Sequence, residues 1–512
     1  MSETAGRSAR IGGEIRPRGL LGGSRSRAGN IVVTVSLGMG LLLAVAVGGL
    51  GGLFAGGVVF AAGYFLTRQS HVTGRSPGAE LIIRAWWALR RRRGETTFVP
   101  LHLASPFPAP TDRVSRRAAG RWARSVRDEA PGLEGIRWLS APGETAVLLH
   151  QCPGEQAYLS VAMEVDGQPP GLRAVGDYDR AAAAYGHLLA RLARDDGLVT
   201  GLQSITRIMP TDSAAHERWA ADHVDPGAPE ALTRSYAELV RMTAGATEMV
   251  RHYLVLRLPV TVTFARAAEA RGDGEQGWAR LAVAQAEWVA TLARRADLRN
   301  PRLLTTHRLA AVLRHMQSPE YPLDQTVDVT TETWLRHQRV LRRATIVDDS
   351  WWHRVAAIPP SAVTPEPVHT RWIAPLLHGI TQPVIRTISL QVEVQPAARA
   401  RKRARADVTV DRGVRESALR RGAVDDGTQA VQLSASAQRL ADLQPGSGIH
   451  GARWAGYLAV TAASENEMNR ACTALADAAG ECGISYLDWL DMRHDAALPT
   501  TWPVWRGLEA QR

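Results

Sequence analysis

The chain of 512 residues is organised around residues 31–66, which read IVVTVSLGMGLLLAVAVGGLGGLFAGGVVFAAGYFL and contain no charged side chain. Roughly 20 apolar residues are enough for one helix to cross the hydrocarbon core of a membrane. This run is therefore too long for a single span, and its glycines at 48–52 divide it. The sequence predicts two short membrane helices, Ile31 to Val47 and Leu53 to Leu66, that form a hairpin.

Three of the glycines, Gly48, Gly52 and Gly56, have the four-residue spacing that lets membrane helices approach closely. That spacing crosses the expected turn between the two helices. We therefore interpret these glycines as turn residues.

Basic residues lie on both sides of the apolar run. Positive charge close to a span is retained in the cytoplasm, so both flanks and both termini are expected on the cytoplasmic side of the cell membrane. A secretory signal would have one short apolar core followed by a cleavage site, and one tilted span would separate the two basic flanks. The flanking arginines are Arg7, Arg10, Arg16, Arg18, Arg25 and Arg27 before the run, and Arg68, Arg75, Arg84 and Arg90 to Arg93 after it.

The net charge of +11 is concentrated near the hairpin. Residues 1–93 contain 13 arginines and 3 acidic residues, whereas the remainder contains 48 basic and 47 acidic residues. The excess positive charge is thus expected to face anionic membrane lipids, where each basic residue contributes about 1 kcal/mol. Three cysteines without CxxC spacing are typical of reduced thiols in a cytosolic domain.

A helix is predicted over residues 79–93, with apolar side chains on one face and arginines at its end. Tryptophan beside arginine is typical of the boundary between lipid and water; the alternative is an ordinary amphipathic helix packed on the next domain. Prolines between 100 and 110 then predict a linker. The candidate membrane-interface residues are Arg84, Trp86, Trp87, Arg90, Arg91, Arg92 and Arg93.

Short strands and helices then alternate in one order that occurs twice. The first series has strands at 136–139, 146–150, 157–163, 204–209, 249–258 and 302–305, and helices at 178–194, 229–243 and 276–295. The second has strands at 351–358, 384–394, 453–461 and 484–492, and helices at 372–380 and 465–479, with a helical stretch between the second and third strands. Each series predicts a split βαβ, or ferredoxin-like, module with a helical insertion.

The predicted fold is therefore α+β: an N-terminal two-helix transmembrane hairpin followed by two ferredoxin-like modules with helical insertions. The predicted organisation is a basic cytoplasmic tail at 1–29, the hairpin at 30–67, a juxtamembrane amphipathic helix and Pro-rich linker at 68–130, and α+β modules at 131–345 and 346–512.

No catalytic, metal-binding or cofactor-binding motif is predicted. Lys402 is the only lysine and has no glycine near it, so the chain lacks the GxxxxGK[ST] loop of a P-loop ATPase. Residues 446–451, GSGIHG, match GxGxxG but follow a helix and lead into a strand, the reverse of a dinucleotide loop, and we interpret them as a turn. Asp348, Asp349 and His353 could serve as acid and base, but Asp-Asp-Ser before an aromatic strand is more simply a turn.

The second helical insertion begins with a cluster of basic residues. At 100° per residue these charges point all around the helix axis, so we expect the segment to bury no face and to remain exposed. A solvated helix is the simpler interpretation; the alternative is contact with an acidic partner or with nucleic acid, although no aromatic residue is interleaved to stack on bases. The candidate partner-binding residues are Arg399, Arg401, Lys402, Arg403 and Arg405.

These features together resemble an actinobacterial conjugal-transfer family. The residues that carry the resemblance are the basic tail, the hairpin, Ile82-Ile-Arg-Ala-Trp-Trp-Ala-Leu-Arg-Arg91, Val175-Gly-Asp-Tyr-Asp179, Tyr185-Gly-His-Leu-Leu-Ala190, Thr206-Arg-Ile-Met-Pro210, Trp351-Trp-His353, Ile358-Pro-Pro360, Pro375-Leu-Leu377, the Arg-rich helix, Gly448-Ile-His-Gly-Ala-Arg-Trp-Ala-Gly456, and Leu498-Pro499 to Trp505-Arg-Gly-Leu508. In that family a membrane hairpin like the small PrgI-type subunit of type IV secretion systems is fused to a region similar to the N-terminal, non-ATPase part of the conjugation ATPase.

The resemblance implies a non-catalytic, membrane-anchored subunit of a type IV-like secretion or conjugation apparatus. Its expected partners are a separate P-loop ATPase, other channel subunits and anionic lipids, and a homo-oligomer is compatible with the sequence. The alternatives are a type VII secretion membrane component and a membrane-bound enzyme with an unrecognised site. The sequence leaves open the cargo and whether nucleic acid is contacted.

Overall fold

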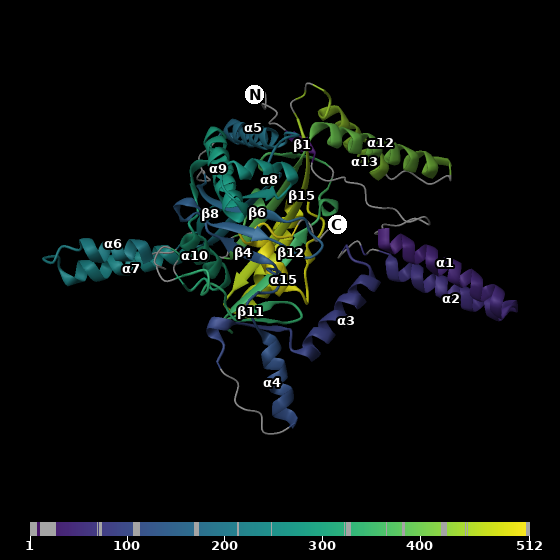
Figure 1. Cartoon of the computed structure of the whole chain (residues 1–512), viewed down its shortest axis with the longest axis horizontal. Helices are drawn as coiled ribbons and strands as arrows, with labels where there is room; N and C mark the ends of the chain where they lie inside the picture. Colours follow the sequence, from purple (N-terminus) through teal and green to yellow (C-terminus); the bar gives the residue numbers. More distant parts are fainter. Residues whose placement is uncertain are drawn as a thin grey trace.

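The computed structural model describes residues 8–10, 27–68, 70, 74–105, 113–167, 174–211, 214–246, 248–321, 323, 329–364, 366–380, 384–420, 427–445, 447 and 449–507. Most of the basic tail, and Gly446 and Gly448 of the GxGxxG match, lie outside these residues. A large sheet forms the body, and helices α1, α2, α3 and α4 and two further helical pairs project from it (Figure 1).

The apolar run forms two helices, α1 (Arg27–Val47) and α2 (Gly49–Thr67), each long and apolar enough to cross a membrane. The chain reverses at Gly48, where φ is 68°, and Gly49 also has a positive φ of 60°. Such angles favour glycine because it has no Cβ. The turn is thus shorter than expected, and α2 begins four residues before the predicted Leu53.

Two of the glycines that were assigned to the turn lie inside α2 and contact α1. A Cβ on Gly52 would lie 2.6 Å from the carbonyl oxygen of Ala44, and a Cβ on Gly56 would collide with Gly40. The turn interpretation is therefore correct for Gly48 and wrong for Gly52 and Gly56. These two allow the helix backbones to pack closely, as small residues do in membranes.

The body sheet has 14 strands in the order β3-β2-β10-β11-β12-β15-β14-β7-β8-β6-β5-β4, with β16 beside β12 and β9 beside β6. All described pairs in it are antiparallel except β2 with β3. The peripheral strands are β2 (Thr97–Pro100), β3 (Val126–Arg127), β4 (Ile136–Leu139), β5 (Val147–His150), β10 (Gln338–Val340) and β11 (Thr345–Val347). The stretch predicted as a juxtamembrane helix and linker therefore also contributes the two strands at one end of the sheet, β3 at the edge and β2 beside it.

The same connectivity occurs twice around the centre of the sheet. The first half contains β6 (Tyr158–Asp166), α5 (Val175–Leu192), β7 (Gly201–Pro210), β8 (Glu248–Pro259), α9 (Gly274–Arg295) and β9 (Arg299–Leu303), with strand order β9-β6-β8-β7. The second contains β12 (Trp351–Ile358), α11 (Ala374–His378), β14 (Ile385–Gln395), β15 (Gly451–Ala462), α14 (Glu465–Glu481) and β16 (Asp488–Trp489), with strand order β16-β12-β15-β14. The two halves join edge to edge where β7 pairs with β14, from Gly201↔Glu393 to Ile208↔Arg386.

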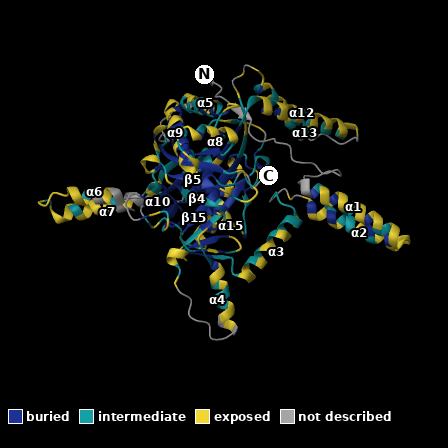
Figure 2. Ribbon diagram, in the orientation of Figure 1, coloured by how far each residue is buried: buried dark blue, intermediate teal, exposed yellow. Residues whose placement is uncertain are grey.

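A pair of helices interrupts the long hairpin in each half. Helices α6 (Ala214–His223) and α7 (Glu230–Ala246) lie between β7 and β8, and α12 (Ala397–Arg420) and α13 (Thr428–Asp442) lie between β14 and β15. Both pairs project from the body, and most of α6–α7 is exposed (Figure 2). We call them the α6–α7 arm and the α12–α13 arm.

Helices cover one face of the sheet, where α5 and α9 pack on the first half and α14 on the second. The opposite face carries a second apolar cluster that includes α10 (Thr306–Gln317) and the end of the chain. The 3-10 helix η4 (Leu498–Thr501) precedes Trp502 and Trp505, which are both about 1% exposed. The remaining elements are β1 (Ser8–Arg10), β13 (Pro367–His369), α3 (Pro77–Arg93), α4 (Arg113–Ser125), α8 (Val262–Glu269) and α15 (His494–Ala497).

Two predicted elements are shorter than expected. The strand predicted at 484–492 is only two residues long in β16, and the helix predicted at 372–380 is the five-residue α11. Leu487 packs into the core while Asp491 pairs with Arg354, so this stretch is held by side-chain contacts more than by a strand ladder. Helix α10 was not predicted; its buried Arg314 and His315 interrupt the apolar pattern that would have indicated it.

Candidate functional site

Helix α3 is connected to the body at both ends. Ser76 caps its first turn by accepting from the backbone N–H of Ala79, which satisfies one otherwise unpaired donor. Just before it, Arg75 pairs with Asp488 at 2.7 Å and donates to the carbonyl of Trp489. Near its end, Arg90 pairs with the buried carboxylate of Asp495. These contacts place α3 between the apolar hairpin and the sheet.

The predicted interface residues all lie on α3 but do not act alike. Arg84 pairs with Glu80 one turn earlier, Arg90 faces the body, and Arg91 lies over the ring of Trp87 at 5.6 Å. The side chain of Trp86 is 60% exposed. Of the predicted interface residues, Arg84, Trp86, Arg91, Arg92 and Arg93 are exposed, whereas Trp87 and Arg90 are half-buried.

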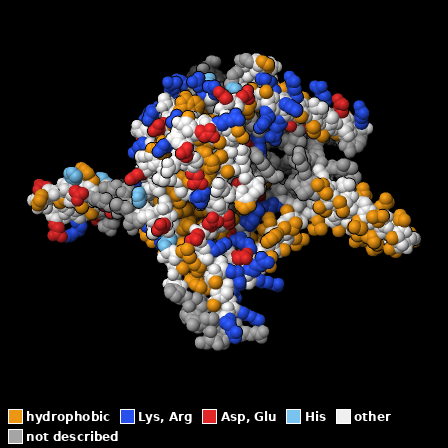
Figure 3. Space-filling model, in the orientation of Figure 1, with side chains coloured by type: hydrophobic (Ala, Val, Ile, Leu, Met, Phe, Trp, Pro, Cys, Tyr) orange, Lys and Arg blue, Asp and Glu red, His pale blue; other side chains and the backbone are white. Residues whose placement is uncertain are grey.

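Helix α4 extends this basic surface and was not predicted. The Nε of its Arg124 donates to the carbonyl of Arg93 at 2.7 Å, so the C-terminal ends of α3 and α4 meet. Basic side chains, which on this helix are all arginines, are visible along α4 in Figure 3. The signal was present in the spacing of its arginines, which are Arg113, Arg116, Arg117, Arg121 and Arg124.

The α12–α13 arm carries the predicted partner-binding residues. Arg399, Lys402, Arg403 and Arg405 are exposed, whereas Arg401 is half-buried. The expectation that this helix buries no face is wrong: Ala400 and Ala404, one turn apart, are buried with Leu443 in a small apolar cluster. Two small residues at this spacing suffice because α13 can approach them closely.

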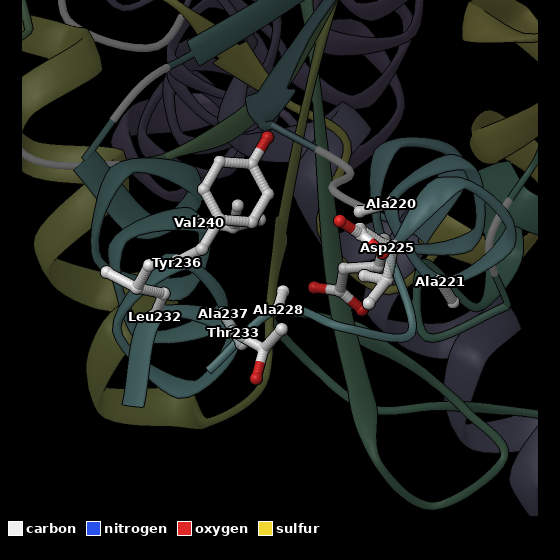
Figure 4. A pocket seen from close by; sticks show the side chains of 11 residues that line it. Ala220, Ala221, Asp225, Ala228, Leu232, Thr233, Tyr236, Ala237 and Val240 are labelled. Carbon is white, nitrogen blue, oxygen red and sulfur yellow. The ribbon is translucent and has the colours of Figure 1, made fainter. Parts of the chain in front are cut away.

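The α6–α7 arm contains an open cleft of about 530 Å³. Leu232 and Tyr236 of α7 lie on one side of it, and Ala220, Ala221 and Asp225 lie on the other (Figure 4). The Nε2 of His216 and the hydroxyl of Tyr236 lie 2.8 Å apart and connect the two helices. The lining is mostly apolar, and its acidic side chains are Glu217 and Asp225.

A second apolar groove, of about 490 Å³, lies over β14 and β15. It is lined by Trp372, Ile373, Leu390 and Trp454, among others. Because α11 has only five residues, it leaves this part of the sheet less covered than α5 and α9 leave the first half. The groove contains one ionisable lining residue, Arg439.

The residues considered as an acid and base are not brought together. Asp348 and Asp349 have positive φ values of 51° and 55° in a turn, and Asp348 accepts from Arg336 at 2.6 Å. His353 is fully buried, with Nε2 2.8 Å from the carbonyl of Gln317 and Nδ1 3.0 Å from the hydroxyl of Thr461. Burial lowers the pKa of His353 to about 3. The turn interpretation of Asp348 and Asp349 is thus confirmed.

Within the described part of the chain, no group of three or more His, Cys, Asp or Glu residues is arranged to hold a metal ion. Gly451, the last residue of the GxGxxG match, opens the strand β15, whereas the glycines of a dinucleotide loop open a helix. The described residues thus form a sheet body from which the apolar hairpin and two helical arms project.

Comparison with models of known protein families and with curated proteins finds no match for this chain.

Proposed function

We propose that this protein is a non-catalytic, membrane-anchored subunit of a type IV-like secretion or conjugation apparatus that docks a separate P-loop ATPase at the cytoplasmic face. The observation that carries the proposal is the pairing of β1, before the hairpin, with β13, after it. A strand that precedes the two spans can pair with one that follows them only if both lie on the same side of the membrane. The body and its two arms are then held together at one face.

The repeated strand order supports a more specific fold. We infer that each half is a ferredoxin-like, or split βαβ, module, because βαββαβ connectivity with order 4-1-3-2 describes β9-β6-β8-β7 and β16-β12-β15-β14 alike. The α6–α7 and α12–α13 arms occupy equivalent positions, between the second and third strands of each module. Paired modules with equivalent insertions would present two related docking surfaces.

The charge distribution supports attachment to anionic lipid. Trp86, Arg91, Arg92 and Arg93 on α3 and Arg116, Arg117, Arg121 and Arg124 on α4 are exposed, and the two helices meet at Arg93 and Arg124. Each such charge close to an anionic bilayer adds about 1 kcal/mol to binding. ATP hydrolysis is assigned to a partner because the only lysine, Lys402, lies exposed on a helix and not in a phosphate-binding loop.

The proposal is tested by gentle crosslinking in native membranes, extraction in detergent and capture of the full-length chain. We expect a P-loop ATPase among the captured proteins, and no ATP turnover by the purified chain alone. A chain without any P-loop ATPase partner, or one that hydrolyses ATP unaided, would overturn the proposal. Capture of small WXG-type substrates and a subtilisin-like protease would favour a type VII system instead.

A further inference from the structure

The two arms have opposite net charge. Residues 214–246 of the α6–α7 arm contain 5 acidic and 3 basic residues, whereas α12 alone contains 8 basic and 3 acidic residues. Surfaces of opposite sign attract each other during association and disfavour pairing of like surfaces. Neither arm is covered by the body along its length (Figure 2).

The two surfaces are also complementary in polarity. The cleft of the α6–α7 arm is apolar along Leu232, Tyr236 and Val240, with Glu217 and Asp225 among its lining residues. On α12, Arg405, Arg412 and Leu419 are seven residues apart and therefore share one face of the helix. All three are exposed, Leu419 by 56%. Leu419 follows the two arginines on this face, so the face offers an apolar side chain to the apolar cleft and positive charge to the acidic residues in its lining.

The fold keeps the two surfaces of one molecule apart. Strands β7 and β14 are antiparallel neighbours, and Ile208, near the end of β7, pairs with Arg386 at the start of β14. The α6–α7 arm thus leaves the sheet at one end of these strands and the α12–α13 arm at the other, as Figure 1 shows. Each surface is available to a different copy of the chain.

We propose that copies of this chain associate head to tail, with the Arg405–Arg412–Leu419 face of α12 seated in the α6–α7 cleft of the next copy. The contact is heterologous, because two different surfaces meet, and it therefore propagates into a ring or a chain of subunits. This inference goes beyond the proposed function. Capture of an ATPase does not depend on it.

The first test is site-directed crosslinking of the full-length chain in native membranes. A short bismaleimide is applied to the double variant Leu232→Cys/Leu419→Cys, and we expect a ladder of dimers, trimers and larger species. The matched control is Leu232→Cys/Ala406→Cys, whose second cysteine lies 13 residues earlier on α12, about 20 Å away. The native cysteines are present in every variant, so the unsubstituted chain gives the background.

The second test is a charge exchange on the crosslinking background. Glu217→Arg is expected to reduce the crosslinked fraction about fivefold, because it places positive charge opposite Arg412. Adding Arg412→Glu is expected to restore it, which a purely structural defect would not allow. Thermal unfolding of each variant checks that the body remains folded.

Three outcomes would overturn the inference: a pattern equal to background, a ladder that stops at the dimer, and a crosslink from Leu232→Cys to an ATPase in place of a second copy. The first two leave the proposed function untouched, because ATPase capture is measured separately. Loss of ATPase capture with an intact ladder would overturn the proposed function alone.

Discussion

At the scale of single residues, His353 is a buried histidine whose protonation couples the stability of the fold to pH. Its neutral ring can donate from Nε2 to the carbonyl of Gln317 and accept at Nδ1 from Thr461, and burial holds its pKa at about 3. In the unfolded chain a histidine titrates near 6.5, so below that pH the unfolded state binds a proton that the folded state does not. The free energy of unfolding should therefore fall as pH decreases from about 6.5 towards 3, by up to about 1.4 kcal/mol per pH unit.

We predict that His353→Gln reduces this acid sensitivity, because an amide can serve both partners without titrating. The measurement is the melting temperature of the full-length chain in detergent at pH 7.5 and pH 5.5. The decrease between the two should be smaller in the variant. An equal decrease would mean that other groups control acid stability.

Arg386 illustrates a charge that the fold requires. It is fully buried, pairs with Glu248 through both oxygens at 2.7 and 3.0 Å, and also donates to the carbonyls of Leu376 and Leu377. Arg386→Met should lower the free energy of unfolding by about 3 kcal/mol, because these acceptors lose their donor. Urea unfolding of both variants measures this loss. The control is Arg234→Met, which breaks the exposed pair with Glu230 and should lower the free energy of unfolding by less than about 0.5 kcal/mol. Equal losses would contradict a structural role for the Arg386 pair.

At the scale of elements, the hairpin depends on close backbone contact. A side chain on Gly56 would collide with Gly40, whereas a Cβ on Gly57, the next residue, would meet nothing within 4 Å. We predict that Gly56→Val separates α1 from α2 and that Gly57→Val does not. Spin labels on cysteines at positions 27 and 68 should show a longer, broader distance distribution only for Gly56→Val. The same distribution in both variants would refute the contact role.

Helix α3 should lose its attachment when Arg90 is removed, because Asp495 is then left buried without its partner. We predict about tenfold faster amide hydrogen exchange over residues 77–93 in Arg90→Ala, corresponding to a loss of about 1.4 kcal/mol. Arg84→Ala is the control, since its pair with Glu80 is half-exposed and lies within the helix. Unchanged exchange in Arg90→Ala would show that Arg75 alone holds α3.

At the scale of the whole molecule, the hairpin model predicts a definite topology. Leu50 lies next to the turn and is 86% exposed, so Leu50→Cys should react with an impermeant maleimide applied outside intact cells. Leu232→Cys, in the α6–α7 arm, should react only after the cells are broken. Labelling of both cysteines from outside would contradict a body held on the cytoplasmic face.

The end of the chain joins the two halves of the body. Gln203 of β7 and Ser389 of β14 both donate to the carbonyl of Thr500, and the hydroxyl of Tyr158 donates to the carbonyl of Trp505. This segment thus crosses the β7–β14 junction on the face opposite α5 and α9. Nothing in its sequence beyond two tryptophans, Trp502 and Trp505, indicated such a position.

The sequence by itself determined the apolar hairpin and the order of strands and helices around the centre of the sheet, because apolar runs, periodicity and glycine are local properties. It located β4 (Ile136–Leu139) and β12 (Trp351–Ile358) to the residue. The spacing of the α4 arginines is also a local property, but their position beside α3 is not.

Only the tertiary structure decided how these parts meet. Three contacts join residues that are separated in the chain. They are the pairing of Ile208 with Arg386, the contact of Gly56 with Gly40, and the hydrogen bond from Tyr158 to the carbonyl of Trp505. Backbone hydrogen bonds between strands look the same for any side chain, so the sequence of β7 does not reveal that β14 is its neighbour. The same is true of the two arms, whose opposite charges are in the sequence but whose opposite directions follow from that antiparallel pairing.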